Sequence, residues 1–252
     1  MSSGSTADGL FIFQDTIESA KRVIPIVLNL LENTPHFIVD LGGGVGSWSR
    51  VFKEFGVSQV LCIDDPRIAL SDLKVDKDEF RGEDLSHRIP EPIKCDLAIS
   101  LEFAEHVPGH LSSDIVRFLT KSAPIVLFSA AIPGQPSIYH INERPARFWK
   151  ELFADQGYTQ FDIVRPQIIH DRSILYCYRQ NLFLYATDNW SKRFEVFKNG
   201  FSDIPMDFEL VHERVLNEYR KQYEYRKQIS RLGVKAWIKE FPRAIRRTLK
   251  RC

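Results

Sequence analysis

The sequence predicts an α/β fold, a largely parallel β-sheet with helices on both faces. Short apolar runs alternate with longer amphipathic segments from residue 37 onward, and alternation at this spacing is typical of β-α-β units. The first apolar run ends in a glycine-rich turn that opens a helix. With 252 residues, 44% of them hydrophobic, the chain is long enough for one such domain and a small appendage.

The order of elements divides the chain into three expected parts. These are an α/β domain over residues 1–190, with an N-terminal helix at 16–32 and a core at 37–187, a helical extension at 191–230, and a tail at 231–252. We expect strands at residues 37–41, 59–63, 79–81, 96–100, 125–129, 161–164 and 182–186, and core helices at 47–55, 109–121 and 143–156. Because no helix is expected between the last two strands, they are predicted to form an antiparallel pair at the edge.

The net charge of +1 hides an uneven distribution. Residues 231–252 carry eight basic side chains and one acidic one, whereas residues 1–230 carry 26 basic and 32 acidic ones. Apolar residues in the tail recur at three- and four-residue steps, which predicts a basic amphipathic helix bent at Pro242. Its expected contacts are the acidic body or a protein partner, then an anionic membrane surface, and with least weight nucleic acid.

Several classes of protein are excluded by simple patterns. No window approaches the roughly 18–20 unbroken apolar residues of a membrane span, and no secretory signal is visible. The four cysteines lie far apart without a C-x-x-C pair, so neither a disulfide framework nor a zinc site is expected. We therefore expect a cytoplasmic protein, with peripheral membrane contact through the tail as an option.

The strongest local motif is FIVDLGGGVGSW at residues 37–48. Glycines let backbone N–H groups approach a ligand that any Cβ would block, and the start of a helix favours negative charge. Asp40 would repel a pyrophosphate at this place but suits a cationic amino group. The motif therefore indicates a nucleoside that bears an amino acid.

Two further acidic positions follow the next expected strands. The second strand ends at Asp64 and Asp65, where a carboxylate can accept both ribose hydroxyls. Asp84 follows the third strand, within reach of an adenine amino group.

With VDLGGGVGSW, CIDD, GEDL and CDLAISLEFAEHV in this order, residues 37–186 resemble the class I S-adenosylmethionine-dependent methyltransferases. The resemblance implies a Rossmann-like sheet of seven mostly parallel strands, S-adenosylmethionine as cofactor and S-adenosylhomocysteine as product. It assigns the methionine end to the glycine loop, the ribose to the second strand end and the adenine to the third. The cofactor-binding residues expected are Asp40, Gly42, Gly44, Gly46, Asp64, Asp65, Asp84 and Ser100.

Methyl transfer requires alignment of the acceptor with the methyl group, and a hydroxyl acceptor must also lose a proton. Glu102, Glu105 and His106 follow the fourth strand and would face one way if a helix begins there. We predict that His106 is the general base, since imidazole titrates near neutral pH, and that Glu102 is the second catalytic residue.

The E-x-x-E-H run also resembles the metal-binding motif of some O-methyltransferases, including ubiquinone-pathway enzymes and small-RNA terminal methyltransferases. On that resemblance Glu102, Glu105, His106 and His140 would hold a divalent ion such as Mg²⁺. The alternative is that Glu102 orients the methionine end and His106 caps or packs a helix.

The acceptor class is indicated by a second resemblance. LFSAAIPGQ, HINERPARFWKELFADQGY, RPQI and YRQN resemble bacterial methyltransferases encoded beside glycosyltransferases and cell-surface-sugar genes. The acceptor-site candidates are Gln135, His140, Asn142, Glu143, Tyr178 and Asn181. Helix capping by Asn142 and Glu143, and simple packing of Tyr178, are the competing interpretations.

The sequence thus predicts an S-adenosylmethionine-dependent O-methyltransferase for a small hydroxylated acceptor, a sugar or sugar-containing metabolite. The alternatives are an RNA or protein methyltransferase and a non-catalytic nucleoside-binding module. A glycosyltransferase contact through the tail and a homodimer through the helical extension are the partner hypotheses.

Overall fold

The computed structural model describes residues 16–137, 139–190, 193–194, 216–217 and 221. The chain divides into two compact units, one of residues 1–133 and 137–210, the other of residues 134–136 and 211–252. The fold described below is that of the first unit. Nearly all of the helical extension predicted at 191–230, and the whole tail at 231–252, lie outside the described residues, so those boundaries stay predictions.

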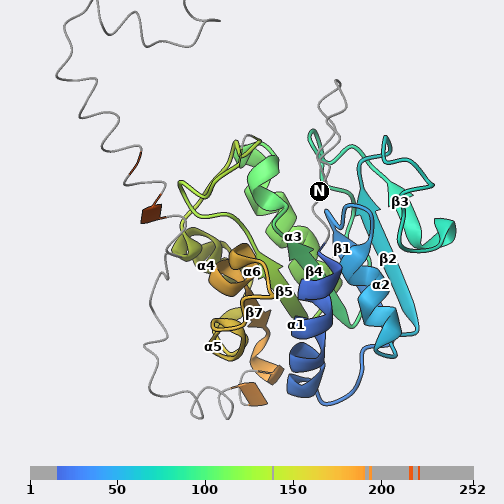
Figure 1. Ribbon diagram of the computed structural model, residues 1–252, viewed down its shortest axis with the longest axis horizontal. Coiled ribbons are helices and arrows are strands. Elements are labelled where there is room, and N and C mark those ends of the chain that lie inside the picture. Colours follow the sequence, from blue (N-terminus) through green and yellow to red (C-terminus); the bar gives the residue numbers. More distant parts are fainter. Residues whose placement is uncertain (1–15, 138, 191–192, 195–215, 218–220, 222–252) are drawn as a thin grey trace, which may run out of the picture. The chain divides into compact units, whose positions relative to one another are not determined.

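The first unit is built on a seven-stranded mixed sheet in the order β3-β2-β1-β4-β5-β7-β6 (Figure 1). The strands are β1 (Phe37–Leu41), β2 (Gln59–Asp64), β3 (Phe80–Gly82), β4 (Leu97–Leu101), β5 (Ile125–Ser129), β6 (Thr159–Phe161) and β7 (Phe183–Ala186). Neighbouring strands from β3 to β5 are parallel, and β7 lies antiparallel between β5 and β6. The Rossmann-like α/β prediction is confirmed.

Helices cover both faces of this sheet. They are α1 (Ile17–Leu30), α2 (Ser47–Glu54), α3 (Ser112–Ser122), α4 (Ala146–Asp155), α5 (Arg165–Ile168) and α6 (Tyr176–Asn181), with 3₁₀ turns η1 (Lys77–Glu79), η2 (Ala104–His106) and η3 (Gly109–Leu111). Buried residues of α1, α2, α5 and α6 pack on one face, and those of α3 and α4 pack on the other. None of the described helices is both long and apolar enough to cross a membrane.

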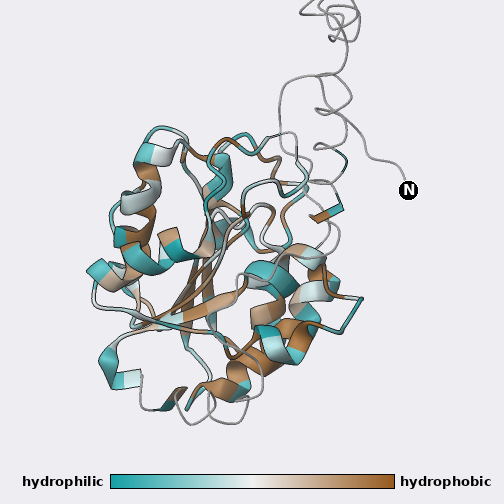
Figure 2. Cartoon of the chain, turned by 90° about the vertical axis from the view of Figure 1, so that its left-hand side faces the viewer, coloured by the Kyte–Doolittle hydropathy of each residue, from teal (hydrophilic) through white to brown (hydrophobic). Residues whose placement is uncertain are grey.

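Side chains of the central strands point alternately to the two faces of the sheet and contribute to the hydrophobic core on each face. In β5, Ile125 and Leu127 pack with the α1 and α2 layer, whereas Val126 and Phe128 pack with the α3 and α4 layer. All five residues of β4 and of β5 are buried, as expected of strands covered on both sides. Figure 2 shows the hydrophobic strands in the interior of the domain.

The edge after β5 is where the sequence prediction fails. The antiparallel edge pair is confirmed, but α5 and α6 lie between its two strands, and the strand expected at 161–164 is β6 at Thr159–Phe161. The chain leaves the sheet after Phe161 because buried Asp162 pairs with buried Arg165 at the start of α5. Arg165 Nη1 also donates to the carbonyl of Gln180 at 2.7 Å. The ion pair joins α5 to the end of β6, and the hydrogen bond to Gln180 joins α5 to α6.

We expect Asp162→Ala to destabilise the domain by about 3–5 kcal/mol, because it leaves a buried guanidinium without its counter-charge. The measurement is the free energy of unfolding in urea. The control is Glu18→Ala, which removes the exposed Glu18–Arg22 pair and should leave the midpoint nearly unchanged. Equal effects of the two substitutions would contradict the role given to the buried pair.

Candidate functional site

The candidate site lies at the carboxyl ends of β1, β2 and β4. The order of strands along the chain reverses between β1 and β4, and ligands of open α/β sheets bind outside the carboxyl ends at such a switch point. The glycine loop that follows β1 is fixed to β2 by Gly42 N, which donates to Ile63 O at 2.8 Å. Gly42 has φ 76°, and a Cβ there would overlap the ring of Phe103. Only glycine fits this turn.

Asp40 lies beneath the glycine loop, 2% exposed. Its Oδ2 accepts a hydrogen bond from Ser49 Oγ of α2 at 2.9 Å. Burial raises the pKa of Asp40 to about 7, against the opposing effect of the Ser49 hydrogen bond. Ser49 was not predicted from the sequence, although a serine two residues into the helix that follows the glycine loop was the available signal. A positive charge above the loop would favour the ionised form of Asp40.

Asp64 ends β2 and contacts the same loop. Its Oδ2 accepts from Gly44 N at 2.6 Å, and its Oδ1 accepts from Asp65 N at 2.6 Å. Burial raises the pKa of Asp64, and these backbone hydrogen bonds oppose that rise. The structure therefore brings Asp64 and the glycine loop together, as the motif spacing predicts.

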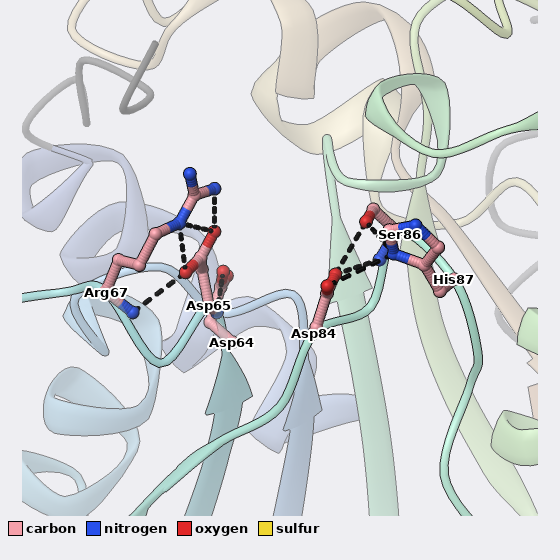
Figure 3. Close-up of polar contacts among 6 residues, drawn as sticks. All are labelled: Asp64, Asp65, Arg67, Asp84, Ser86 and His87. Atoms are coloured by element: carbon pink, nitrogen blue, oxygen red, sulfur yellow. Dashed lines mark hydrogen bonds and ion pairs between the residues drawn. The ribbon is translucent and has the colours of Figure 1, made fainter. Parts of the chain in front are cut away.

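Asp65 and Asp84 lie nearby at the same edge of the sheet (Figure 3). The Asp65 carboxylate pairs with Arg67 at 2.5 Å, which lowers its pKa. Asp84 accepts from Ser86 Oγ at 2.6 Å and contacts His87 Nδ1 at 3.1 Å. The hydrogen bonds from Ser86 are the main cause of the lowered pKa of Asp84. Both groups are thus ionised acceptors, and Asp84 is the more exposed, at 62% of its side chain.

The end of β4 carries a strained residue. Glu102 has φ 52°, the one positive value among the non-glycine residues that the structure describes, and such strain often marks functional sites. Its backbone N donates to Ser129 O at 3.0 Å, and its carboxylate accepts from Asn181 Nδ2 at 3.0 and 3.3 Å. Ser100, two residues earlier, has a buried Oγ with no hydrogen-bond partner among the described residues. This serine offers a polar contact beside Glu102.

No helix begins at Glu102, so the condition under which Glu102, Glu105 and His106 would face one way is not met. The chain forms only the three-residue turn η2 at Ala104–His106, because the positive φ of Glu102 breaks a helical path. Glu102 is not part of the cluster that Glu105 and His106 form with His140. Three of the four predicted metal ligands come together: one ligand atom from each of Glu105, His106 and His140 lies within 4.8 Å of the others.

Both histidines of this cluster have a fixed tautomer. His106 Nδ1 lies 3.3 Å from Tyr139 O, and His140 Nδ1 lies 3.0 Å from Glu143 Oε1. Because a carbonyl and a carboxylate accept hydrogen bonds, Nδ1 is the donor in each ring, which leaves Nε2 as the atom that would coordinate a cation. His140 Nε2 lies 3.9 Å from Glu105 Oε1. Ligand histidines are oriented in this way by an acceptor behind the ring.

Glu105 is the unusual member of the cluster. It is fully buried, and neither of its carboxylate oxygens has a hydrogen-bond partner among the described residues. Burial, followed by the charge of Glu102, raises its pKa well above the ordinary value. Burial and then neighbouring His140 lower the pKa of His106 to about 4. A neutral imidazole with so low a pKa is a weak base but a competent metal ligand.

The remaining acceptor-site candidates, Asn142, Tyr178 and Gln135, lie in different surroundings. Asn142 is buried and donates from Nδ2 to Ala104 O and to Ser112 Oγ, each at 3.1 Å, which favours a structural role. Tyr178 is 3% exposed in the core, where Trp48 Nε1 donates to its hydroxyl at 3.2 Å. Gln135 belongs to the second unit, so its part in acceptor binding stays a prediction.

No protein-family model and no curated protein matches the sequence. The fold is similar to that of human N-acetylserotonin methyltransferase, with 14% sequence identity over 68% of this chain and 54% of that chain and a TM-score of 0.45. It is also similar to magnesium protoporphyrin IX methyltransferase from Synechocystis PCC 6803, with 19% identity over 72% of this chain and 87% of that chain and a TM-score of 0.48. Another similar structure is the methyltransferase domain of bacterial CtHen1, with 13% identity over 68% of this chain and 99% of that chain and a TM-score of 0.48. The chain spans about half the length of the human protein. All these TM-scores lie below 0.5, so no residue of the site is assigned from them.

We expect Gly42→Ala to cost about 1–3 kcal/mol more than Gly56→Ala, because of the overlap with Phe103. Gly56 is the matched control, since it has φ 97° but open space where a Cβ would lie, so it should cost only the backbone strain of about 1–2 kcal/mol. Denaturant unfolding measures both. Similar costs would show that the loop does not need its close approach to Phe103.

Proposed function

We propose that this protein is an S-adenosylmethionine-dependent O-methyltransferase. The observation that carries the proposal is the arrangement at the switch point of the seven-stranded sheet: a glycine loop after β1 whose Gly44 N–H is held by the Asp64 carboxylate at 2.6 Å, above buried Asp40. Carboxylates at these places suit a cationic amino group and ribose hydroxyls rather than a diphosphate.

The cofactor-binding roles follow from this arrangement. Asp40 would supply negative charge beneath the methionine ammonium, while Gly42, Gly44 and Gly46 allow close approach of the loop backbone. Asp64, with Asp65 beside it, would accept the ribose hydroxyls, and Asp84 the adenine amino group. Ser100 and Glu102, at the end of β4, would contact the methionine end nearest the acceptor.

The chemistry is an in-line displacement. The acceptor oxygen attacks the sulfonium methyl carbon, and the carbon–sulfur electron pair returns to sulfur, which leaves neutral S-adenosylhomocysteine. The acceptor's hydroxyl proton must leave as well. Because the pKa of His106 is lowered to about 4, unassisted proton removal by this residue would be weak.

A divalent cation held by Glu105, His106 and His140 would assist removal of the acceptor's proton. The donor set fits: a buried carboxylate with no hydrogen-bond partner among the described residues and two imidazoles with Nδ1 already hydrogen-bonded. Such an ion, Mg²⁺ or another divalent metal, would lower the pKa of a bound hydroxyl and orient it. Glu143 would hold His140 in position, and Glu102 would stand beside the cluster, hydrogen-bonded to Asn181.

The acceptor is proposed to be a small hydroxylated molecule, and the sequence resemblance favours a sugar or a sugar-containing metabolite. We also propose a cytoplasmic location. Dimer formation through residues 191–230, and contact of the tail at 231–252 with a membrane or a glycosyltransferase, stay proposals because nearly all of these residues lie outside the described ones.

S-adenosylmethionine and S-adenosylhomocysteine should both bind, and more tightly as the pH rises. The folded-state pKa of Asp40, about 7, lies above the ordinary carboxyl value, so the charge that attracts the ammonium group is present above pH 7 and is lost below it. Affinity should fall roughly tenfold from pH 7 to 5.5. Isothermal titration calorimetry measures it, and absence of binding by either compound at every pH would refute the proposal.

Asp40→Asn should weaken binding and remove most of this pH dependence, leaving only the contribution of Asp64. The matched control is Asp171→Asn, a half-exposed carboxylate far from the glycine loop in sequence that accepts hydrogen bonds from Ser173 and contacts Arg22. It should keep the wild-type profile. A wild-type profile in the Asp40 variant would show that another group titrates.

Mn²⁺ should bind the purified protein and raise its melting temperature, whereas Glu105→Gln should weaken Mn²⁺ binding by more than roughly tenfold. In a chelator, Glu105→Gln should unfold no earlier than wild type, because it removes a buried carboxyl that has no hydrogen-bond partner among the described residues. Calorimetry and thermal unfolding measure the two effects.

The matched control is Glu54→Gln, a helix-surface carboxylate that pairs with Arg50. It should leave Mn²⁺ affinity unchanged. Mn²⁺ affinity that survives both Glu105→Gln and His140→Ala would place the ion elsewhere.

A further inference from the structure

Glu102 is held in its strained conformation from two sides. On one side its backbone N–H donates to Ser129 O and to Ser129 Oγ, at 3.0 and 3.1 Å. On the other side its carboxylate accepts from Asn181 Nδ2, at 3.0 and 3.3 Å. A residue with positive φ persists where its surroundings fix it. The contacts with Ser129 fix the backbone, whereas the contact with Asn181 fixes the direction of the carboxylate.

The amide of Asn181 is itself oriented by a neighbour. Gln180 Nε2 donates to Asn181 Oδ1 at 2.9 Å, and an ionised carboxylate can only accept. The Asn181 side chain therefore has one orientation that satisfies both contacts, with its nitrogen toward Glu102. Asn181 and Gln180 are 4% and 3% exposed. Burying two amides is unfavourable unless their hydrogen bonds are made, so this pair is typical of a polar network that fixes one geometry.

The helix α6, which carries both amides, also contacts the glycine-loop side of the site. Tyr178 Oη accepts from Trp48 Nε1 at 3.2 Å, and Trp48 lies in the first turn of α2, directly after the loop. Arg165 Nη1 donates to Gln180 O at 2.7 Å and joins α6 to α5. One helix thus contacts the start of α2 and the end of β4, the two elements between which the proposed function puts the methionine end of the cofactor.

The residue after Glu102 lies against the glycine loop. A Cβ on Gly42 would come within 2.0 Å of the Phe103 ring. The strands β1 and β4 are parallel neighbours in which Asp40 pairs with Ile99, so their carboxyl ends meet at this edge of the sheet. The Glu102 carboxylate is therefore a negative charge next to the loop, on the side where the proposed function puts the sulfur of S-adenosylmethionine.

We propose that Asn181 is a positioning residue that directs the Glu102 carboxylate toward the sulfonium of S-adenosylmethionine, so that the site distinguishes the charged cofactor from its neutral product. This role rests on the proposed methyltransferase function. Methyl transfer leaves both electrons of the broken carbon–sulfur bond on sulfur, which turns the sulfonium into a neutral thioether. The attraction to Glu102 is then lost, which favours exchange of S-adenosylhomocysteine for new cofactor.

The test is the ratio of the dissociation constants of S-adenosylhomocysteine and S-adenosylmethionine. Isothermal titration calorimetry measures both on the full-length protein at about pH 8, where Asp40 is ionised. The two compounds differ only in the methyl group and its charge, so changes in the ammonium and ribose contacts cancel in the ratio. Glu102→Gln should lower the ratio roughly tenfold, because it removes the negative charge. Asn181→Leu should lower it about threefold and leave the affinity for S-adenosylhomocysteine nearly unchanged.

A double-mutant cycle separates positioning from a structural role. In the Glu102→Gln background, Asn181→Leu should change the ratio no further, because a positioning residue acts through the group that it holds. Gln180→Met removes the donor that orients Asn181 and should lower the ratio in the same direction. The matched control is Gln160→Met, which removes a part-buried amide that donates to Tyr185 Oη at 2.9 Å. It should keep the wild-type ratio.

An unchanged ratio in Asn181→Leu overturns the positioning role and leaves the proposed function in place. So does an equal loss of affinity for both compounds, which is what a merely structural role would give. If Asn181→Leu does not fold, Gln180→Met, alone and with Glu102→Gln, decides in the same way. Failure of the wild-type protein to bind either compound refutes the proposed function, and the positioning role with it.

Discussion

The carboxyl edge of the sheet is organised around acidic groups that have been taken out of water. Asp40, Asp64 and Glu105 are all strongly desolvated, and burial is the largest cause of the raised pKa of each. A buried carboxylate is costly unless hydrogen bonds or a positive charge stabilise it. Two of these groups have hydrogen-bond donors in Ser49 and the loop backbone. The Glu105 carboxylate has no hydrogen-bond partner among the described residues, so its charged form would gain the most from a bound cation.

The surrounding fold supports this edge by fixing its loops. Gly42 N ties the glycine loop to β2, and the backbone N–H groups of Ile141 and Asn142 both donate to Glu105 O, at 2.9 and 3.0 Å. The second contact brings a segment 36 residues later in the sequence against η2, so that His140 faces Glu105. A site assembled from β1, β2, β4 and this distant loop depends on the parallel order of the strands, which sets all their carboxyl ends at one edge.

Local patterns predicted much of this arrangement. The bounds of β1 and β5 were predicted to the residue. The motif order also named the glycine loop and Asp64, which contact each other through the Gly44 N–H. Features that depend on contacts between distant parts of the chain, or on a strained backbone, were not predicted. The positive φ of Glu102 and the Asp162–Arg165 pair depend on tertiary packing. So does the burial of Tyr178, a residue whose sequence context suited an acceptor site and simple packing equally well.

The separation of Glu102 from the other three predicted ligands gives the two acids of the E-x-x-E-H run different roles. The Glu105 carboxylate lies near both histidines, whereas the Glu102 carboxylate accepts hydrogen bonds from Asn181. The strained backbone of Glu102 is what permits this, because a helical conformation there would set both carboxylates on one face. Under the proposed function, Glu105 would hold a cation and Glu102 would contact the methionine end of the cofactor, so substitutions at the two positions should not be interchangeable.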